Sequence, residues 1–309
     1  MTDATVSPTA ASNPSGPPSP GVRASGRQAR GTTPPSGPVL FARYAFGPNR
    51  LGLCGPEDWR SLLELGAAGA AASAGSDGSR PGTRDAAPAN PDARTRALVT
   101  DIDHSLRDLA ARFEGAYPYL ELIARAHGIS DVMDRRVVDA YWIGNTLSDQ
   151  VDPGLMLQSM DTRFRAQLSP EAWRWLEGKP QAGARPTHAF HVFDVFPRVG
   201  LMRGGAVTDA IKLMDSCRIR WGRVLEVKGE QLLVNAVPLR LVEGKLVLGE
   251  ARPQAVRRWL DGTGFVSDVE IGDVVSLHWD WACEVLSPAR LDALQRRTTH
   301  QLGLANQTI

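Results

Sequence analysis

The sequence predicts an α+β protein with a mainly helical N-terminal domain and a C-terminal OB-like small β-barrel that ends in a helix. Three observations support this fold class. Apolar residues recur at helical spacing over residues 95–178. A period-two alternation of apolar and polar residues begins at Cys217, which is typical of strands. A Ser-Pro pair at Ser287 then opens a final helical segment.

The first 38 residues differ in composition from the rest of the chain. They are rich in Pro, Ser, Gly, Thr and Ala and hold few large apolar side chains, so we expect residues 1–38 to be disordered. A second low-complexity stretch covers residues 67–94, which we interpret as a flexible insertion within a domain. The composition therefore predicts a helical domain over residues 39–215 that contains this insertion.

Helix starts can be recognised within the helical domain. Asp152 and Ser169 each precede a proline, a combination that caps a helix and begins its first turn. Residues 188–202 read instead as an extended segment, because they are aromatic and β-branched. A short helix over residues 206–214 then leads to the barrel domain, residues 216–309.

The first barrel strand is predicted over residues 217–227, with Ile219, Trp221, Leu225 and Val227 on one face. Further short strand candidates follow, separated by turns that are rich in glycine. Several short strands, glycine turns and a terminal helix together indicate a five-stranded barrel of the OB type.

The net charge and the number of cysteines indicate which kinds of partner to expect and in which cellular compartment the protein acts. The formal net charge is +1, so there is no electrostatic reason to expect nucleic acid or an anionic membrane as a partner. There are three cysteines, and the N-terminus lacks the apolar core of a secretory signal. An odd, sparse set of cysteines predicts free thiols in the cytoplasm, where a thiolate can serve as a ligand.

Two segments of the predicted barrel carry a family resemblance. Cys217, Gly222, Arg223 and Val224 match an opening of Cys, a short apolar stretch, Gly, a basic and an aliphatic residue. The second segment matches in Gly272, Asp273, Val275, His278, Ala282, Glu284 and Leu286. Together they resemble the HypC/HupF chaperones of nickel–iron hydrogenase maturation. The whole chain also resembles an uncharacterised bacterial family with no established activity.

The resemblance implies a function and a site. HypC/HupF chaperones use their cysteine to hold an iron centre that carries cyanide and carbon monoxide. Their partners are a maturation scaffold protein and the hydrogenase large subunit. Carried over to this chain, the resemblance makes Cys217 the thiolate ligand, and we assign His278 as a second donor or hydrogen-bond partner. We expect the two side chains to converge at one rim of the barrel, with Arg218 or Arg220 close enough to favour the thiolate.

This chain also departs from the family pattern. The family cysteine follows the initiator methionine, whereas Cys217 is internal, and Trp221 stands where the family has proline. An internal cysteine has no free α-amino group beside it.

Three other residues are weaker metal-ligand candidates. His188 and His191 form an H-x-x-H pair, but on a regular strand their side chains would point to opposite faces, so we interpret them as structural. Cys54 lies in a glycine-flanked turn that can expose a thiol, although a packed turn residue is the simpler interpretation. Cys283, by contrast, lies in apolar company on the last predicted strand and reads as a core residue.

Two functions from different classes follow from the sequence. The first is a hydrogenase-maturation accessory protein that uses the barrel thiol to bind an iron centre or a maturation partner. The second is a helical enzyme or small-ligand-binding protein whose barrel only binds other proteins. The sequence contains no P-loop, nucleophile-elbow, H-E-x-x-H or C-x-x-C motif, which favours a protein that is not an enzyme.

Overall fold

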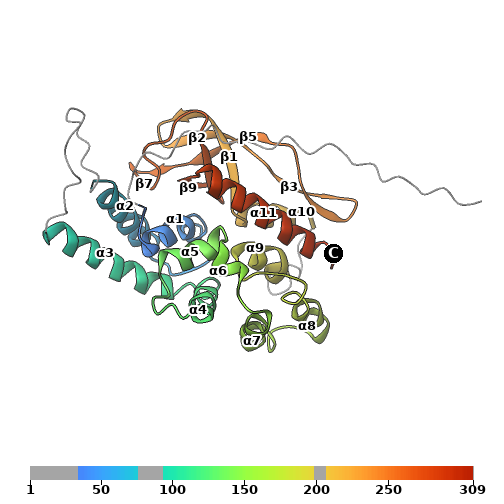
Figure 1. Cartoon of the computed structure of the whole chain (residues 1–309). Helices are drawn as coiled ribbons and strands as arrows, with labels where there is room; N and C mark the ends of the chain where they lie inside the picture. Colours follow the sequence, from blue (N-terminus) through green and yellow to red (C-terminus); the bar gives the residue numbers. More distant parts are fainter. Residues whose placement is uncertain (1–33, 76–92, 198–206, 309) are drawn as a thin grey trace, which may run out of the picture.

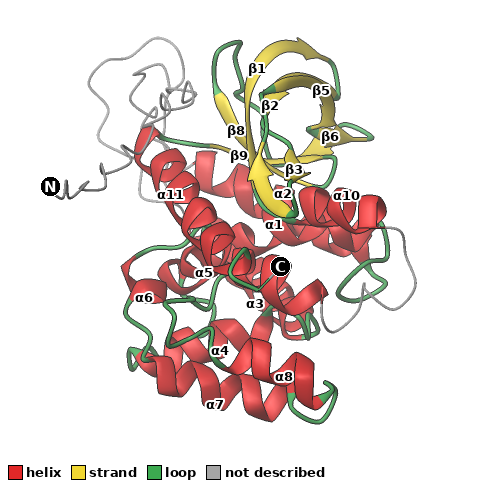
Figure 2. Ribbon diagram, turned by 90° about the vertical axis from the view of Figure 1, so that its right-hand side faces the viewer, coloured by secondary structure: helices red, strands yellow, loops and turns green. Residues whose placement is uncertain are grey.

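The computed structural model describes residues 34–75, 93–197 and 207–308. A barrel of strands lies above a layered group of helices, and the C-terminal helix runs along the boundary between them (Figures 1 and 2). The predicted fold class is therefore confirmed. The change from helical to β structure falls between Cys217, which ends a helix, and Arg220, which begins a strand.

Within the described ranges, eight helices precede His188: α1 (Gly37–Arg50), α2 (Trp59–Gly75), α3 (Ala93–Ala111), α4 (Tyr117–Ala126), α5 (Arg135–Trp142), α6 (Thr146–Asp149), α7 (Pro153–Phe164) and α8 (Pro170–Glu177). The predicted caps at α7 and α8 are present. The Asp152 side chain accepts hydrogen bonds from the backbone N–H groups of Gly154 and Leu155, and Ser169 accepts one from Ala172.

Helix α1 is the centre of the packing. Every residue from Gly37 to Asn49 except Arg43 is buried, so this helix is covered on all sides rather than along one stripe. It packs against α2, α3 and α5 and also against the barrel strands β8 and β9. The Phe46 ring meets Trp281 edge to face, with 4.5 Å between centroids. One hydrophobic core therefore continues from the helices into the barrel.

The two segments expected to be flexible are in part helical. Helix α1 begins at Gly37, inside the stretch 1–38, and α2 continues to Gly75, inside the stretch 67–94. The expectation is wrong at the start of α1 because Ser36 caps this helix and proline suits its first turn. It is wrong in α2 because alanine-rich low-complexity sequence also has high helix propensity, and α2 packs on α1 and α3. Residues 1–33 and 76–92, to which the rest of the expectation applies, lie outside the described residues.

The stretch predicted as extended is helical where the structure describes it. Helix α9 (His188–Phe190) continues directly into a single π-helical turn, η1 (His191–Val195). Thr187 caps this segment by accepting a hydrogen bond from the backbone N–H of Phe190. The prediction was wrong because most of the segment is buried, and a short, buried apolar run has no polar face to reveal its period.

Five strands form the barrel: β1 (Arg220–Lys228), β2 (Gln231–Ala236), β5 (Arg252–Arg257), β8 (Val274–His278) and β9 (Trp281–Val285). They close in the order β1-β2-β5-β9-β8, and the β5–β9 pair is parallel, with Arg257 opposite Trp281. The hairpins β3 (Leu239–Val242) with β4 (Lys245–Leu248), and β6 (Trp259–Leu260) with β7 (Thr263–Gly264), project from the barrel.

A β-bulge in β1 changes which residues face the barrel interior from those predicted. Pairing with β2 shifts register between Val224 and Glu226, which leaves Leu225 between them without a partner in that register. Trp221 is buried as expected, but Leu225 is 40% exposed and Val224 takes the inward position. The alternation is correct only up to the bulge.

Two further helices frame the barrel. Helix α10 (Val207–Cys217) precedes the first barrel strand, and α11 (Pro288–Ala305) follows the last one. The side chain of Ser287 caps α11, as predicted. Helix α11 contacts α9, η1 and β4, so it bridges the helical part and the barrel. None of the helices in the described ranges has the length and apolar character needed to cross a bilayer.

Candidate metal centre

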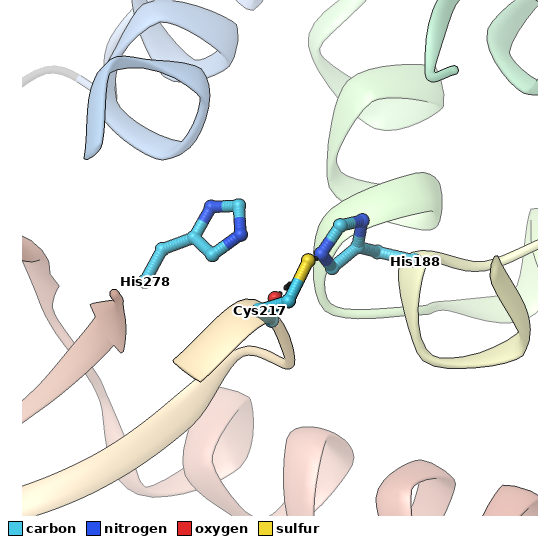
Figure 3. Close-up of side chains that lie close together, drawn as sticks. All are labelled: His188, Cys217 and His278. Carbon is cyan, nitrogen blue, oxygen red and sulfur yellow. Dashed lines mark hydrogen bonds between the residues drawn. The ribbon is translucent and has the colours of Figure 1, made fainter. Parts of the chain in front are cut away.

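Three potential metal ligands from different parts of the chain meet where the helices contact the barrel. His188 comes from α9, Cys217 is the last residue of α10, and His278 ends β8 (Figure 3). One ligand atom from each, a ring nitrogen or the thiol sulfur, lies within 4.8 Å of the other two. The structure therefore places Cys217 and His278 together, as expected, and adds His188.

Backbone contacts at the barrel rim hold this arrangement. The backbone N–H of Trp279, in the turn between β8 and β9, donates a hydrogen bond of 2.8 Å to the carbonyl of Ser216 in α10. This contact holds His278 and Cys217 side by side. Trp279 has a φ of +58°, a left-handed conformation that a bulky residue rarely adopts and that clusters at functional sites.

His278 presents a ring nitrogen suited to metal binding. Its Nδ1 lies 2.6 Å from the backbone carbonyl of Tyr44, and since a carbonyl only accepts, Nδ1 carries the proton. The neutral ring then has its lone pair on Nε2. His278 is 1% exposed, and Nε2 has no hydrogen-bond partner among the described residues. A hydrogen bond from the protonated ring nitrogen to a carbonyl is what commonly orients histidine ligands in metal sites.

His188 has both ring nitrogens engaged. Its Nε2 lies 2.8 Å from the carbonyl of Cys217, and its Nδ1 lies 3.1 Å from the hydroxyl of Tyr141. Nε2 therefore donates to the carbonyl, and Nδ1 accepts from the hydroxyl. To ligate through Nε2, the ring must release the carbonyl and move its proton to Nδ1. The Tyr141 hydroxyl permits this change because it can also accept a hydrogen bond.

Burial controls protonation at the site. It lowers the pKa of His188 from 6.5 to about 4, and it lowers the pKa of His278 well below 6.5. Burial also raises the pKa of the Cys217 thiol from 9.0 to about 12. Both imidazoles are therefore neutral at pH 7, while a metal ion would have to displace the proton of the thiol.

The flanking arginines do not activate the thiol. Arg218 donates to Asp215 and to the carbonyl of Val237, while Arg220 donates to Gln254 and to the carbonyl of Trp279. The expectation that one of them lowers the thiol pKa is wrong, because both side chains are directed to other partners and desolvation dominates. The nearby Trp279 side chain is the one group that lowers the pKa of the thiol.

A buried polar network fixes the element that orients His278. The Tyr44 hydroxyl donates to Glu284 and lies 3.1 Å from the Ser276 hydroxyl. Arg290 of α11 donates to Glu284 and also to Asp139 of α5. Tyr44 is thus fastened at its hydroxyl by this network, while its carbonyl accepts from His278. The side chain of Glu284, part of the family-like motif, thus links β9 to α1 and α11.

Aromatic rings enclose the histidines. Trp142 lies with its ring centroid 4.8 Å from that of His188 and 5.6 Å from that of His278. Trp142 in turn stacks on Tyr44 at 5.5 Å. These rings exclude water and leave the ligand atoms in a low-dielectric environment, which strengthens binding of a charged ion to its ligands.

The remaining sequence candidates lie outside the three-residue cluster. The His191 ring lies 6.2 Å from that of His188 and packs edge to face on Tyr119. Cys54 is exposed in the loop after α1, and Cys283 is buried, with its thiol 3.7 Å from the Trp281 carbonyl. All three cysteines of the chain are free thiols. His191, Cys54 and Cys283 therefore do not complete the site.

The donor set fits a thiophilic transition metal. One thiolate and two imidazoles supply three of four tetrahedral positions, a set used for zinc, iron and copper. Ligand atoms on one such ion lie roughly 3.5 Å apart, so the side chains need to close by only about 1 Å from the observed spacing. The unpartnered Nε2 of His278 is the observation that points to a ligand.

Sequence reasoning missed Tyr44, Tyr141 and Trp142 as contacts of the site. Nothing in the spacing of residues reveals that the Tyr44 carbonyl faces a histidine more than 200 positions later. The all-round apolar character of residues 38–48 was an available signal that this helix is central, but it does not identify what the helix contacts.

Comparison with known proteins identifies the family. A family model described as a family of unknown function (DUF6390) matches residues 33–309, and the chain belongs to this family. No curated protein matches the chain, and no solved structure matches it.

Proposed function

We propose that this DUF6390 protein is a metal-centre-binding accessory protein of hydrogenase maturation, acting in the cytoplasm. Cys217, His188 and His278 hold the metal, which we assign as an iron centre with cyanide and carbon monoxide ligands. A maturation scaffold protein or the hydrogenase large subunit is the partner. The unpartnered, buried Nε2 of His278 beside a thiol carries the proposal.

The arrangement of the barrel supports the hydrogenase part of the proposal. Cys217 lies close before the first strand, with Arg218 and Ile219 between them, and Gly272 and Asp273 directly precede β8. His278 then ends β8, and α11 follows the last strand. This is the order of features on which the resemblance to the HypC/HupF family rests, now within one closed barrel.

The surroundings of the thiol indicate the type of binding. Cys217 is half-buried where the helices meet the barrel, and two neutral imidazoles lie beside it. A thiolate with two nitrogen donors beside it holds a metal more firmly than a single exposed cysteine. We therefore propose storage or insertion of an assembled centre, with release dependent on a partner that opens the contact between α9 and the barrel.

The first experiment tests the metal site. Purified full-length apoprotein is titrated with Co²⁺ under anaerobic conditions, and thiolate-to-cobalt charge transfer is followed in the near ultraviolet. Cys217→Ser should abolish this band and weaken binding by at least 100-fold, because the soft donor is lost. Cys54→Ser makes the same chemical change at an exposed thiol and should bind Co²⁺ like the wild type. Equal binding by the Cys217 variant would refute the metal site.

A second experiment tests the hydrogenase assignment separately. The protein is isolated anaerobically from cells that mature a nickel–iron hydrogenase, and its infrared spectrum is recorded. Bands of iron-bound cyanide and carbon monoxide should accompany the wild type and be absent from the Cys217→Ser variant. A protein that binds Co²⁺ through Cys217 but carries no such bands, and whose deletion leaves maturation unchanged, would disprove the hydrogenase role while retaining the metal site.

One observation favours the alternative of a small-ligand-binding protein. A groove between α4 and α7 combines apolar side chains such as Leu122 and Ile129 with Arg125 and Arg163. Such a groove suits an apolar molecule with an acidic group. Saturable stabilisation by aromatic or aliphatic carboxylic acids that is lost in Arg163→Gln, together with unchanged hydrogenase maturation on deletion, would favour this alternative.

A further inference from the structure

A small, partly enclosed cavity lies beside the candidate metal centre. Its lining includes Trp142, Thr187, Arg218 and Thr298, and it has room for one water-sized species. Thr187 directly precedes His188, and Arg218 directly follows Cys217. The cavity is therefore next to two of the three candidate ligands, but its lining does not include them.

Two buried side chains that line the cavity carry hydrogen-bond donors without an acceptor. Arg218 is 1% exposed; its Nε and Nη2 donate to Asp215 and Val237, whereas Nη1 has no partner among the described residues. Trp142 is 4% exposed, and its Nε1 likewise has no acceptor there. Buried donors are nearly always satisfied, so two in one cavity wall indicate a missing acceptor.

The charges around the cavity favour an anion over water. The lining contains Arg218 and Arg297 but no acidic residue. Each arginine is paired with one aspartate, Asp215 and Asp149 respectively, which lie outside the lining. A water molecule would need acceptors as well as donors, and among the lining side chains only the hydroxyls of Thr187 and Thr298 can accept, whereas an anion needs only donors.

We propose that this cavity binds one small inorganic anion of about the size of chloride, held by Nη1 of Arg218 and Nε1 of Trp142. The site exists in the metal-free protein and does not depend on the proposed function. If the metal centre forms as proposed, the neighbouring metal cation attracts the anion. Bound metal should then raise the affinity of the protein for the anion, and bound anion should raise its affinity for the metal. This coupling alone rests on the proposed function.

The test uses the metal-free full-length protein and sodium bromide as the probe. Thermal unfolding is measured against bromide concentration, with ionic strength held constant by sodium gluconate, whose anion is too large for the cavity. Bromide should give a saturable increase in the melting temperature. Crystals soaked in bromide should show an anomalous peak between Arg218 and Trp142. No bromide-specific stabilisation, or a bromide located elsewhere, would overturn the proposal.

Matched variants locate the effect. Trp142→Phe keeps an aromatic ring but removes the N–H, and should weaken bromide binding at least fivefold. Trp173→Phe makes the same change at a buried tryptophan of α8 and should keep the wild-type affinity. Unchanged affinity in Trp142→Phe would refute the assigned donor. If Trp142→Phe does not fold, the anomalous peak in the wild type decides the question.

A third variant separates this proposal from the proposed function. Cys217→Ser cannot form the metal centre, yet it leaves Arg218 and Trp142 in place, so it should retain bromide binding within about twofold. Loss of metal binding with retained bromide binding supports the anion site independently. If the wild-type protein binds the metal but shows no effect of bromide, only the anion site is refuted.

Discussion

Glu284→Gln is the most informative test of how the barrel and the helices are joined. Glu284 is 7% exposed on β9 and accepts hydrogen bonds from Tyr44 of α1 and Arg290 of α11. Glutamine keeps the volume and one acceptor oxygen but removes the negative charge. The substitution therefore tests the ion pair and leaves the packing nearly unchanged.

The expected loss of stability in Glu284→Gln depends on which partners Arg290 keeps. Removing one partner of a buried ion pair costs about 3–5 kcal/mol when the other charge is left alone. Arg290 keeps its contact with Asp139, and its side chain is 20% exposed, so part of this penalty is avoided. We expect Glu284→Gln to lower the free energy of unfolding by about 2 kcal/mol.

Burial by itself raises the pKa of Glu284, but Arg290 and Tyr44 hold that pKa below its ordinary value of 4.5. A carboxyl group whose pKa is lower in the folded state stabilises the protein above its unfolded pKa. This contribution is lost as the pH falls below 4.5. The stability difference between the wild type and Glu284→Gln should therefore shrink below pH 4.5.

Urea unfolding of the wild type, Glu284→Gln, Arg290→Met and the double variant measures the coupling. We expect a coupling energy of about 1–2 kcal/mol between Glu284 and Arg290, since the pair is in direct contact. Co²⁺ affinity should fall less than about tenfold in Glu284→Gln, because His278 is oriented by the Tyr44 carbonyl and not by its hydroxyl. A cost below 0.5 kcal/mol or zero coupling would refute the reasoning.

Three further perturbations probe the site and the core. Burial lowers the pKa of His188 to about 4, so the unfolded chain binds a proton at this residue more readily than the folded protein does. Urea unfolding should therefore show that His188 lowers the free energy of unfolding by about 2 kcal/mol between pH 7 and pH 5. Lys179→Met should cost about 3–5 kcal/mol, because Asp194 is 0% exposed and loses its cation at 2.9 Å; thermal unfolding near the wild-type temperature would contradict this. In Gly47→Ala, the added Cβ would lie 2.6 Å from the His278 carbonyl oxygen, so α1 and β8 must move apart. We expect the free energy of unfolding to fall by about 1–3 kcal/mol and Co²⁺ to bind more weakly. An unchanged Co²⁺ titration would show that the site does not depend on this contact.

Local sequence signals were sufficient for most elements of the fold. The Asp-Pro and Ser-Pro pairs cap helices as predicted, because capping depends on a few consecutive residues. The strand pattern after Cys217 identified the barrel, since alternation reports directly on the two faces of a strand. The meeting of Cys217 and His278 was expected because both were predicted at strand ends of one small barrel; Cys217 instead ends α10 just before β1, and the two side chains still meet.

The tertiary structure alone decided the third ligand and its surroundings. His188 joins the cluster because residues 188–195 are helical, which a short and mostly buried apolar run does not reveal by its period. The bulge at Leu225 depends on pairing with β2, not on the residues of β1 alone. Similarly, the Tyr44 carbonyl and the cavity beside Arg218 exist only because α1, α5 and α11 pack against the barrel. The sequence by itself thus determined most of the elements and two of the candidate ligands. Long-range packing, which local periodicity does not encode, determined what surrounds those ligands.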